Sequence, residues 1–333
     1  MSIKKLAAVL AASVISVTAV TVTAFAAGTK VPITEKYFPD KNFRKYVAEN
    51  FDTDENGYLS QKERDAVTEI EVCKKKIKSL KGIQYFKNVE YLWCDGNELT
   101  KLDISKCTKL EVLYCYDNKL KSLDISKNNQ IECLDCRNNK LTSVVIGEKS
   151  KLENIDCSEN KLTSIDVTQV INLGEFQCYS NSLTSLDVSK NKHLEMLVCD
   201  DNKLTKLNLS KNKELQYLYC NDNELTSLDV SKNPRLEHIL CDGNKITELD
   251  ISKNPKLEYF YCNDNELTSL DVSKNTRLYY FRCHNNNLTS LDISKNPKLI
   301  QLWCEGNKIT KLDISKNTKL EDFKYDDNVQ IIK

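Results

Sequence analysis

The chain has 333 residues with 48 basic and 48 acidic side chains, so its formal net charge is zero. It has no cationic excess of the kind that binds nucleic acid through counterion release, and we expect no nucleic-acid partner. With 8 Gly and 5 Pro, the composition also excludes collagen-like and low-complexity classes, while 40% apolar residues are enough to build a core.

Residues 1–27 predict a secretory signal peptide. Lys4 and Lys5 form a positive start, residues 6–22 are mostly apolar, and Ala24-Phe25-Ala26 fits the small-x-small cleavage pattern. We expect a secreted or extracellular mature protein with no membrane span, and association with the cell surface stays open.

Residues 52–63 read D-x-D-x-N-G-Y-L-S-x-x-E, which resembles the calcium-binding loop of EF-hands. The resemblance implies calcium as the cofactor, because this ion prefers six to eight hard oxygen ligands. The ligands it implies are the side chains of Asp52, Asp54 and Asn56, the carbonyl of Tyr58, Ser60 directly or through water, and both carboxylate oxygens of Glu63.

The segments beside this loop predict two short helices. Residues 40–51 place Phe43, Val47 and Phe51 on one helical face, and Ser60-x-x-Glu63 is a capping box that opens a second helix. We therefore expect residues 28–69 to form a small EF-hand-like helical cap. One hand is visible, so we expect weak calcium binding with a structural role; a calcium-sensing switch is the alternative.

Residues 70–333 carry a 21-residue repeat, which is best followed through its cysteines. Six positions per unit are apolar, at −5, −2, 0, +5, +8 and +10 from the cysteine. Their alternation predicts two short strands per coil, and stacked coils would bury all six positions in one core. The recurring cysteines are Cys94, Cys115, Cys136, Cys157, Cys178, Cys199, Cys220, Cys241, Cys262, Cys283 and Cys304, with Cys73 one period upstream and Tyr325 one period downstream.

The half-repeats LxxLxCxxN and LxxLxVxxN resemble the consensus strand of the leucine-rich-repeat family, and the nested unit is similar to the short bacterial class and to internalins. The resemblance implies a mainly β repeat solenoid that is monomeric. The recurring Asn after the first strand is expected to hydrogen-bond its own turn and the neighbouring coil. The units near Val144 and Val167 lose their second half, and the last unit reads as a polar cap, with Gln330 where a core Leu is expected.

The fourteen cysteines predict buried thiols rather than disulfides. Thiols in register on parallel strands keep their Cβ atoms about 5 Å apart, beyond the ~3.8 Å of a disulfide. A straight row also cannot form a tetrahedral metal site. Cys107 takes a turn-Asn position and Cys133 an exposed strand position, so either is open to oxidation.

In the leucine-rich-repeat family the outward residues of the first strand line the ligand face, here positions −3, −1, +1 and +2. Aromatic residues with a few charges are typical of interaction hot spots, although aromatics also suit exposed strands in general. The aromatic residues of this face are Tyr91, Trp93, Tyr114, Tyr116, Tyr217, Tyr219, Tyr259, Tyr261, Tyr280 and Trp303. The interleaved acidic residues are Asp95, Asp117, Asp200, Asp201, Asp222, Asp242, Asp264 and Glu305.

The sequence predicts no enzymatic activity. It has no nucleophile elbow, HExxH, phosphate-binding Gly loop or paired CxxC, and His193, His238 and His284 occupy different positions in different coils. We expect a module that binds a protein partner. A carbohydrate or cell-envelope binder and a structural envelope component are the alternatives, which the sequence does not separate.

Overall fold

The structure is a computed structural model that describes residues 30–333. The predicted signal peptide, residues 1–27, lies outside the described residues. Among residues 30–333, no helix combines the length and the apolar character needed to cross a bilayer.

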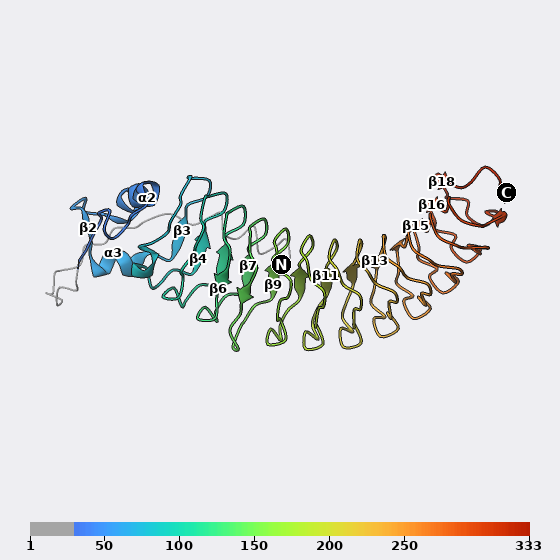
Figure 1. Cartoon of the computed structure of the whole chain (residues 1–333), viewed down its shortest axis with the longest axis horizontal. Coiled ribbons are helices and arrows are strands. Elements are labelled where there is room, and N and C mark those ends of the chain that lie inside the picture. Colours follow the sequence, from blue (N-terminus) through green and yellow to red (C-terminus); the bar gives the residue numbers. More distant parts are fainter. Residues whose placement is uncertain (1–29) are drawn as a thin grey trace, which may run out of the picture.

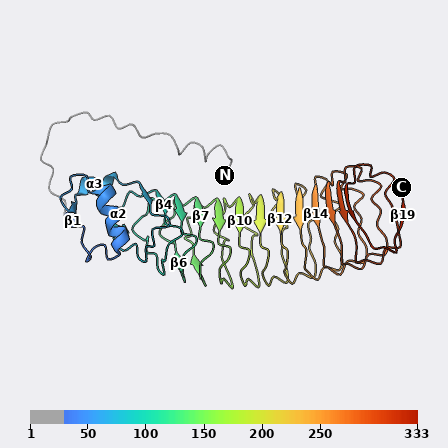
Figure 2. The same cartoon turned by 90° about the horizontal axis from the view of Figure 1, so that it is seen from above.

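The repeats form a curved stack of coils held by one thirteen-stranded parallel sheet (Figure 1). Neighbouring strands pair in register, so Leu218 lies between Leu197 and Ile239, and Figure 2 shows the strands side by side along one side of the stack. This confirms the predicted fold class, a mainly β repeat solenoid. The strands are β3 (Glu69–Glu71), β4 (Tyr91–Trp93), β5 (Val112–Tyr114), β7 (Cys133–Asp135), β9 (Asn154–Asp156), β10 (Glu175–Gln177), β11 (Met196–Val198), β12 (Tyr217–Tyr219), β13 (His238–Leu240), β14 (Tyr259–Tyr261), β15 (Tyr280–Arg282), β16 (Gln301–Trp303) and β18 (Asp322–Lys324).

The second strand expected in every coil forms at two places. In the described residues, β6 (Leu123–Asp124) pairs with β8 (Val144–Val145), and β17 (Lys311–Asp313) pairs with β19 (Gln330–Ile332). A ladder needs strands about 4.8 Å apart, and a curved stack cannot hold this spacing on every side (Figure 1). The expectation of two strands per coil was therefore wrong for most coils, although their apolar positions are buried as predicted.

The six apolar positions of the repeat form one continuous core. Around Cys220, the side chains of Leu215, Leu218, Leu225 and Val230 are fully buried. The same cluster runs from the N-terminal helices to the last coil. Burial therefore links every coil to its neighbours, which makes the stack cooperative.

Two ladders of asparagine side chains donate hydrogen bonds to backbone carbonyls in the turns of neighbouring coils. In the predicted ladder, Asn223 Nδ2 donates to the carbonyls of Cys199 and Cys220, and its Oδ1 accepts from Leu204 N at 2.9 Å. In a second ladder thirteen residues after the cysteine, Asn254 is fully buried and Nδ2 donates to the carbonyls of Val230 and Asn233 at 3.1 and 2.9 Å. Asparagine side chains thus hydrogen-bond the backbone carbonyls in the parts of the coil where no paired strands form.

The ends of the solenoid depart from the 21-residue period. Glu71 pairs with Trp93, so Val72 takes the ladder position and Cys73 falls one residue beyond it, which corrects the expected alignment. At the other end Leu312 pairs with Ile331. The last coil is thus two residues short, and Val329 is buried while Gln330 is exposed.

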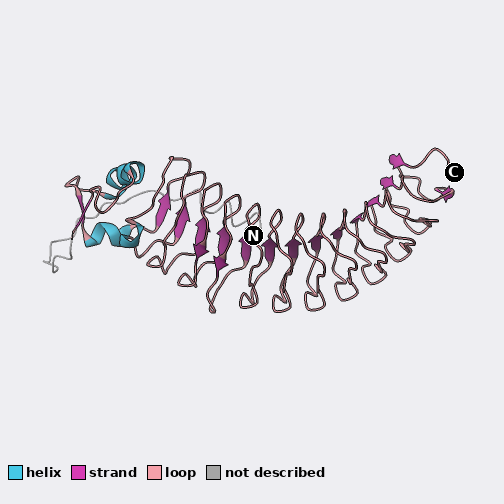
Figure 3. Ribbon diagram, in the orientation of Figure 1, coloured by secondary structure: helices cyan, strands magenta, loops and turns pink. Residues whose placement is uncertain are grey.

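The N-terminal cap contains the two predicted helices, α2 (Lys41–Phe51) and α3 (Gln61–Ala66). Figure 3 shows both helices at one end of the stack, beside the first coils, which also contain the short 3-10 helix η1 (Ile83–Tyr85). The cap is joined to the first coil by polar contacts, since Asn42 Nδ2 donates to Lys75 O at 2.8 Å and Lys78 N to Asp40 Oδ2 at 2.7 Å. The apolar side chains Phe38, Phe43 and Val47 of the cap belong to the same buried cluster as the coils, so cap and solenoid share one core.

Candidate functional site

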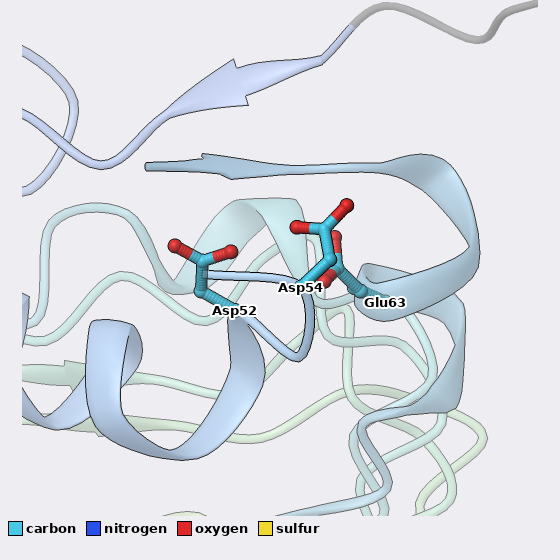
Figure 4. Close-up of side chains that lie close together, drawn as sticks. All are labelled: Asp52, Asp54 and Glu63. Carbon is cyan, nitrogen blue, oxygen red and sulfur yellow. The ribbon is translucent and has the colours of Figure 1, made fainter. Parts of the chain in front are cut away.

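The loop between α2 and α3 brings three carboxylates together. One ligand atom from each of Asp52, Asp54 and Glu63 lies within 4.8 Å of the others. Figure 4 shows that they come from the end of α2, the loop and the start of α3. The sharp turn between them needs Gly57, whose φ is +80°.

Hydrogen bonds from the backbone shape this loop. Asp52 Oδ1 and Oδ2 accept from the amides of Asn56 and Gly57 at 3.1 and 2.8 Å, and Asn56 Oδ1 accepts from Tyr58 N at 2.9 Å. The Asn56 side-chain amide donates to Asp54 Oδ2 at 2.6 Å. The side chains that the sequence suggested as ligands are thus held close together before any ion is considered.

Glu63 is the buried member of the group and forms the predicted capping box. Its Oε2 accepts from Ser60 N at 2.8 Å, and Ser60 Oγ accepts from Glu63 N at 3.2 Å. Burial alone would raise the pKa of Glu63, but hydrogen bonds from Ser60 and Thr53 lower it to about 2. The carboxylate is therefore charged at neutral pH, as a metal ligand must be.

A strand from the start of the described chain pairs with the loop. β1 (Val31–Pro32) runs antiparallel to β2 (Tyr58–Leu59), and Ile33 N donates to Gly57 O at 3.0 Å. Leu59 is fully buried. The loop strand of this single hand is therefore paired within the chain rather than left as an open edge.

The donor set fits calcium in kind. Asp52, Asp54 and Glu63 supply carboxylate oxygens and Asn56 an amide oxygen, which are the hard ligands this ion prefers. The Asp52 and Asp54 oxygens that accept one hydrogen bond keep a further lone pair, whereas Glu63 Oε1 accepts from both Thr53 N and Thr53 Oγ1 at 2.8 Å. The chemistry of the residues is thus compatible with the predicted calcium loop.

The aromatic residues of the strand face are half-buried rather than fully exposed. Towards the C-terminal half, rings pack across neighbouring strands: Tyr259 and Tyr280 are stacked at 4.7 Å between centroids, and His238 lies 4.2 Å from Tyr259. Towards the N-terminal end, Tyr91 stacks on Trp93 of the same strand at 5.7 Å. Neighbouring strands are close enough that rings in register cover one another's faces. In this cross-strand stack, neighbouring rings therefore cover part of one another's faces.

The predicted face divides into two aromatic patches. The first patch comprises Tyr91, Trp93, Tyr114 and Tyr116, and the second comprises Tyr217, Tyr219, His238, Tyr259, Tyr261, Tyr280 and Trp303. Between them, β7, β9 and β10 carry short or polar outward residues such as Cys133, Asp135 and Gln177. A hollow of about 210 Å³ lies there, lined by Tyr114, Asp135, Arg137, Asp156 and Glu175 among others.

Several acidic residues predicted on this face serve the turns instead. Asp200 Oδ1 accepts from Asn221 N at 2.6 Å, and Asp242 Oδ1 accepts from Asn263 N at 2.8 Å. Asp95 is buried and accepts from the Cys73 thiol at 2.8 Å. Burial raises the pKa of Asp200 to about 6. These three carboxylates are therefore part of the scaffold more than of an open ligand face.

Two features of the face were missed at the level of sequence. His238 joins the tyrosine column of the second patch, and its Nδ1 lies 3.1 Å from the hydroxyl of Tyr219. A column of glutamates also precedes the aromatics, four residues before the ladder cysteine. The column would have been found if position −4 relative to the ladder cysteine had been included among the outward positions. Its members are Glu90, Glu111, Glu132, Glu153, Glu195, Glu237, Glu258 and Glu321.

All fourteen cysteines are free thiols. Burial raises the pKa of Cys220 and most other ladder thiols well above the ordinary value. Cys107 is fully buried in its turn-Asn position, and burial raises its pKa to about 12, so the expectation that it is open to oxidation was wrong. Cys133 is half-buried rather than exposed, because its Sγ packs 3.8 Å from the hydroxyl of Tyr114.

The continuous sheet, the buried thiol row and the asparagine ladders define a cysteine-ladder repeat solenoid. Residues 87–128 match a family model described as two copies of leucine-rich repeats, and residues 284–299 match a model of one such repeat. The functional domain of InlJ from Listeria monocytogenes, which includes a cysteine ladder, is 30% identical, with 91% of this chain and 77% of that chain covered and a TM-score of 0.60. The chain belongs to the leucine-rich-repeat family.

Two further solved structures share the fold. The leucine-rich-repeat protein LIC12759 of Leptospira interrogans is 24% identical, covers 77% of this chain and 71% of its own, and has a TM-score of 0.70. The internalin InlF of Listeria monocytogenes is 21% identical, covers 90% and 98%, and has a TM-score of 0.66. No curated protein sequence matches the chain.

Proposed function

We propose that this protein is a secreted or surface-associated scaffold that binds a protein partner through the two aromatic patches of its strand face, with calcium bound at the loop of the cap. The predicted signal peptide and the likeness to InlJ support secretion. We propose no catalytic role, because the acidic side chains of the face follow the repeat and His193, His238 and His284 occupy different positions in different coils.

The packing of the rings favours a protein over a glycan. Sugars bind aromatic residues by stacking on ring faces, but Tyr259 and Tyr280 cover each other's faces. Trp303 has a cation over it on either neighbouring strand, with Arg282 at 3.9 Å and Lys324 at 3.4 Å from its ring centroid. Ring edges with hydroxyl groups suit the mixed apolar and hydrogen-bonding contacts of protein interfaces. This covering of ring faces is the observation that carries the proposal.

The binding test uses the mature protein against immobilised host surface proteins and immobilised glycans. Trp93→Ala/Tyr114→Ala and Tyr259→Ala/Tyr280→Ala should each abolish capture of a protein partner, since hot-spot aromatics dominate interface energies. Ile171→Ala, which removes an exposed apolar side chain outside the two patches, is the control and should bind normally. Retention on glycans, or full binding by both double variants, would move the function to the envelope-binding or structural alternatives.

We further propose that calcium binds at Asp52, Asp54, Asn56, Tyr58, Ser60 and Glu63 and steadies the cap on the first coil. The ion would neutralise three carboxylates that lie within 4.8 Å of one another. Affinities of extracellular calcium modules are about 10⁻⁴–10⁻³ M, so 10 mM calcium should stabilise the fold by about 1–3 kcal/mol.

The calcium test is a thermal melt with and without the ion. Asp54→Asn should lose most of the calcium-dependent rise in Tm, whereas Asp65→Asn, an exposed acidic residue of α3, should keep it. A rise in Tm that is the same for both variants, or that magnesium reproduces at equal concentration, would count against a calcium-specific loop.

A further inference from the structure

The charges of this neutral chain are separated around the coil. The glutamate column defined above runs beside the −3 aromatics, and its backbone is continuous, with Glu111 N donating to Glu90 O and Glu132 N to Glu111 O, both at 2.8 Å. Exposed aspartates follow at +2, at Asp117, Asp201, Asp222 and Asp264. Lysines lie in the turns twelve residues after the cysteine, such as Lys190 and Lys232, and further basic residues lie two positions before the glutamates, such as Lys109 and Lys256. The strand face is therefore acidic although the whole chain is not.

The two arginines at the outward strand positions between residues 90 and 306 show how this face holds a cation. Arg137 lies 4.6 Å from the ring centroid of Tyr116 and pairs with Asp135 and Asp156 at 3.0 and 3.3 Å. Arg282 lies between the rings of Tyr261 and Trp303, at 4.3 and 3.9 Å. In both cases a guanidinium group is held by aromatic rings, and at Arg137 also by carboxylates.

Elsewhere on the face, Arg277 pairs with Glu258 of the glutamate column and Lys324 lies over the ring of Trp303, whereas at the first patch a carboxylate lies directly beside a tyrosine. The hydroxyl of Tyr91 donates to Glu111 Oε2 at 3.3 Å, with Trp93 stacked on its ring at 5.7 Å. Burial raises the pKa of Tyr217, and the negative charges of Glu237, Glu258 and Glu195 raise it further, which agrees with an acidic surface around the second patch. Carboxylates and ring edges therefore lie together where a partner would dock.

We infer that the partner bound by this face presents a basic surface, with Lys or Arg side chains that lie against the tyrosines between the glutamate and aspartate columns. The inference rests on the proposed protein-binding function and adds the charge of the partner. Complementary charge would steer the encounter and raise the association rate, and it would make binding weaken with salt. The hollow between the two patches is less open to such a side chain, because Arg137 already pairs there with Asp135 and Asp156.

The test measures binding of a fluorescent twelve-residue peptide of alternating Arg and Leu to the full mature protein by anisotropy. The face variant is Glu153→Gln/Glu195→Gln/Glu237→Gln; glutamine already occurs at this register as Gln216. The matched variant is Asp187→Asn/Asp229→Asn/Asp250→Asn in the turns, where Asn208 already occurs and accepts from Ser210 N at 3.1 Å. Both remove three negative charges, and equal Tm values would show that both fold.

The face variant should weaken peptide binding roughly tenfold, as expected for three exposed charge pairs, while the turn variant should change it less than about twofold. A peptide with Glu in place of Arg should not bind. Equal weakening in both variants, unchanged binding in the face variant, or equal binding of the acidic peptide would overturn the inference. The proposed function would survive any of these results if a captured protein partner is still lost in Tyr259→Ala/Tyr280→Ala.

Discussion

The two sides of each coil differ in how much they vary along the stack. On the turn side the motif L-D-V/I-S-K-N recurs with little change, and its Asp accepts from the Ser amide two residues on in coil after coil, at 2.9 Å for Asp187 and 2.8 Å for Asp250. On the strand side the outward pair changes from Tyr217 and Tyr219 in β12 to Cys133 and Asp135 in β7.

The difference separates what the fold requires from what it leaves free. Core leucines, ladder cysteines and buried asparagines recur because each one contacts the equivalent residue of the next coil, and a change would break a row. Outward strand residues have no such restriction, so the fold itself does not require their aromatic and acidic character. Equivalent positions in different coils can therefore be compared with one another. The expected effect of a substitution on stability depends on which side of the coil carries it.

The largest effect is expected in the buried row of the turn side. Asn254→Ala removes two hydrogen bonds, to Val230 O and Asn233 O, inside the core. Two buried acceptors without donors should lower the free energy of unfolding by about 2–3 kcal/mol. Chemical denaturation measures it. A loss below about 0.5 kcal/mol would mean that the second asparagine ladder contributes little to stability.

On the strand side, Asp200→Asn should raise the free energy of unfolding, by less than Asn254→Ala lowers it. Burial raises the pKa of Asp200 to about 6 from 3.8, so the folded state binds more protons in this window and its stability falls as pH rises through it. Asn keeps the acceptor for Asn221 N and should be more stable than the wild type by roughly 1–2 kcal/mol at pH 7, with no gain below pH 3.8. Melts at pH 3.5 and 7 test this, and an equal difference at both would rule out the charge as its cause.

A smaller gain is expected at the bend that joins the two sides. The residue two after the ladder cysteine has positive φ in coil after coil, and Ser180 adopts +49° where Gly243 adopts +62°. Ser180→Gly should relieve this strain at some cost in chain entropy and stabilise by about 0.5 kcal/mol, whereas Ser180→Ala should not. If both variants melt alike, backbone strain is not what limits this position.

The smallest effect is expected on the exposed part of the turn side. Asp250→Asn keeps the side-chain acceptor for Ser252 N, as Asn208 does for Ser210 N in a neighbouring coil. We expect no measurable change in Tm at pH 7. A clear loss would show that the carboxylate charge, rather than the hydrogen bond, makes this motif recur.

Most of the scaffold could be predicted from the sequence, because the recurring apolar positions of the repeat indicate which side chains are buried. The positions of Leu215, Leu218 and Cys220 in the core, the first asparagine ladder, and the helix–loop–helix with its capping box at Ser60 were all found in the structure. The ligand role of residues in the calcium loop stays a prediction.

What the sequence did not reveal depends on spacing in three dimensions. Apolar periodicity reports which side chains are inside, but not whether neighbouring backbones are close enough to pair, so the missing second strands were unforeseen. Cys73 resembled a ladder member because the first coil is one residue longer than the others. The contact of His238 with Tyr259 depends on residues 21 apart becoming neighbours, which a linear search for histidine clusters does not consider.

The cysteine row also constrains the order in which the protein matures. In an extended chain all fourteen thiols are open to any oxidant and to one another, and random pairing would trap coils out of register. Once the coils stack, burial shields most of the row and holds the sulfur atoms at a spacing unsuited to bonding. Folding must therefore finish before oxidation begins, and a chain of this design has a higher yield wherever stacking is fast and oxidants are scarce.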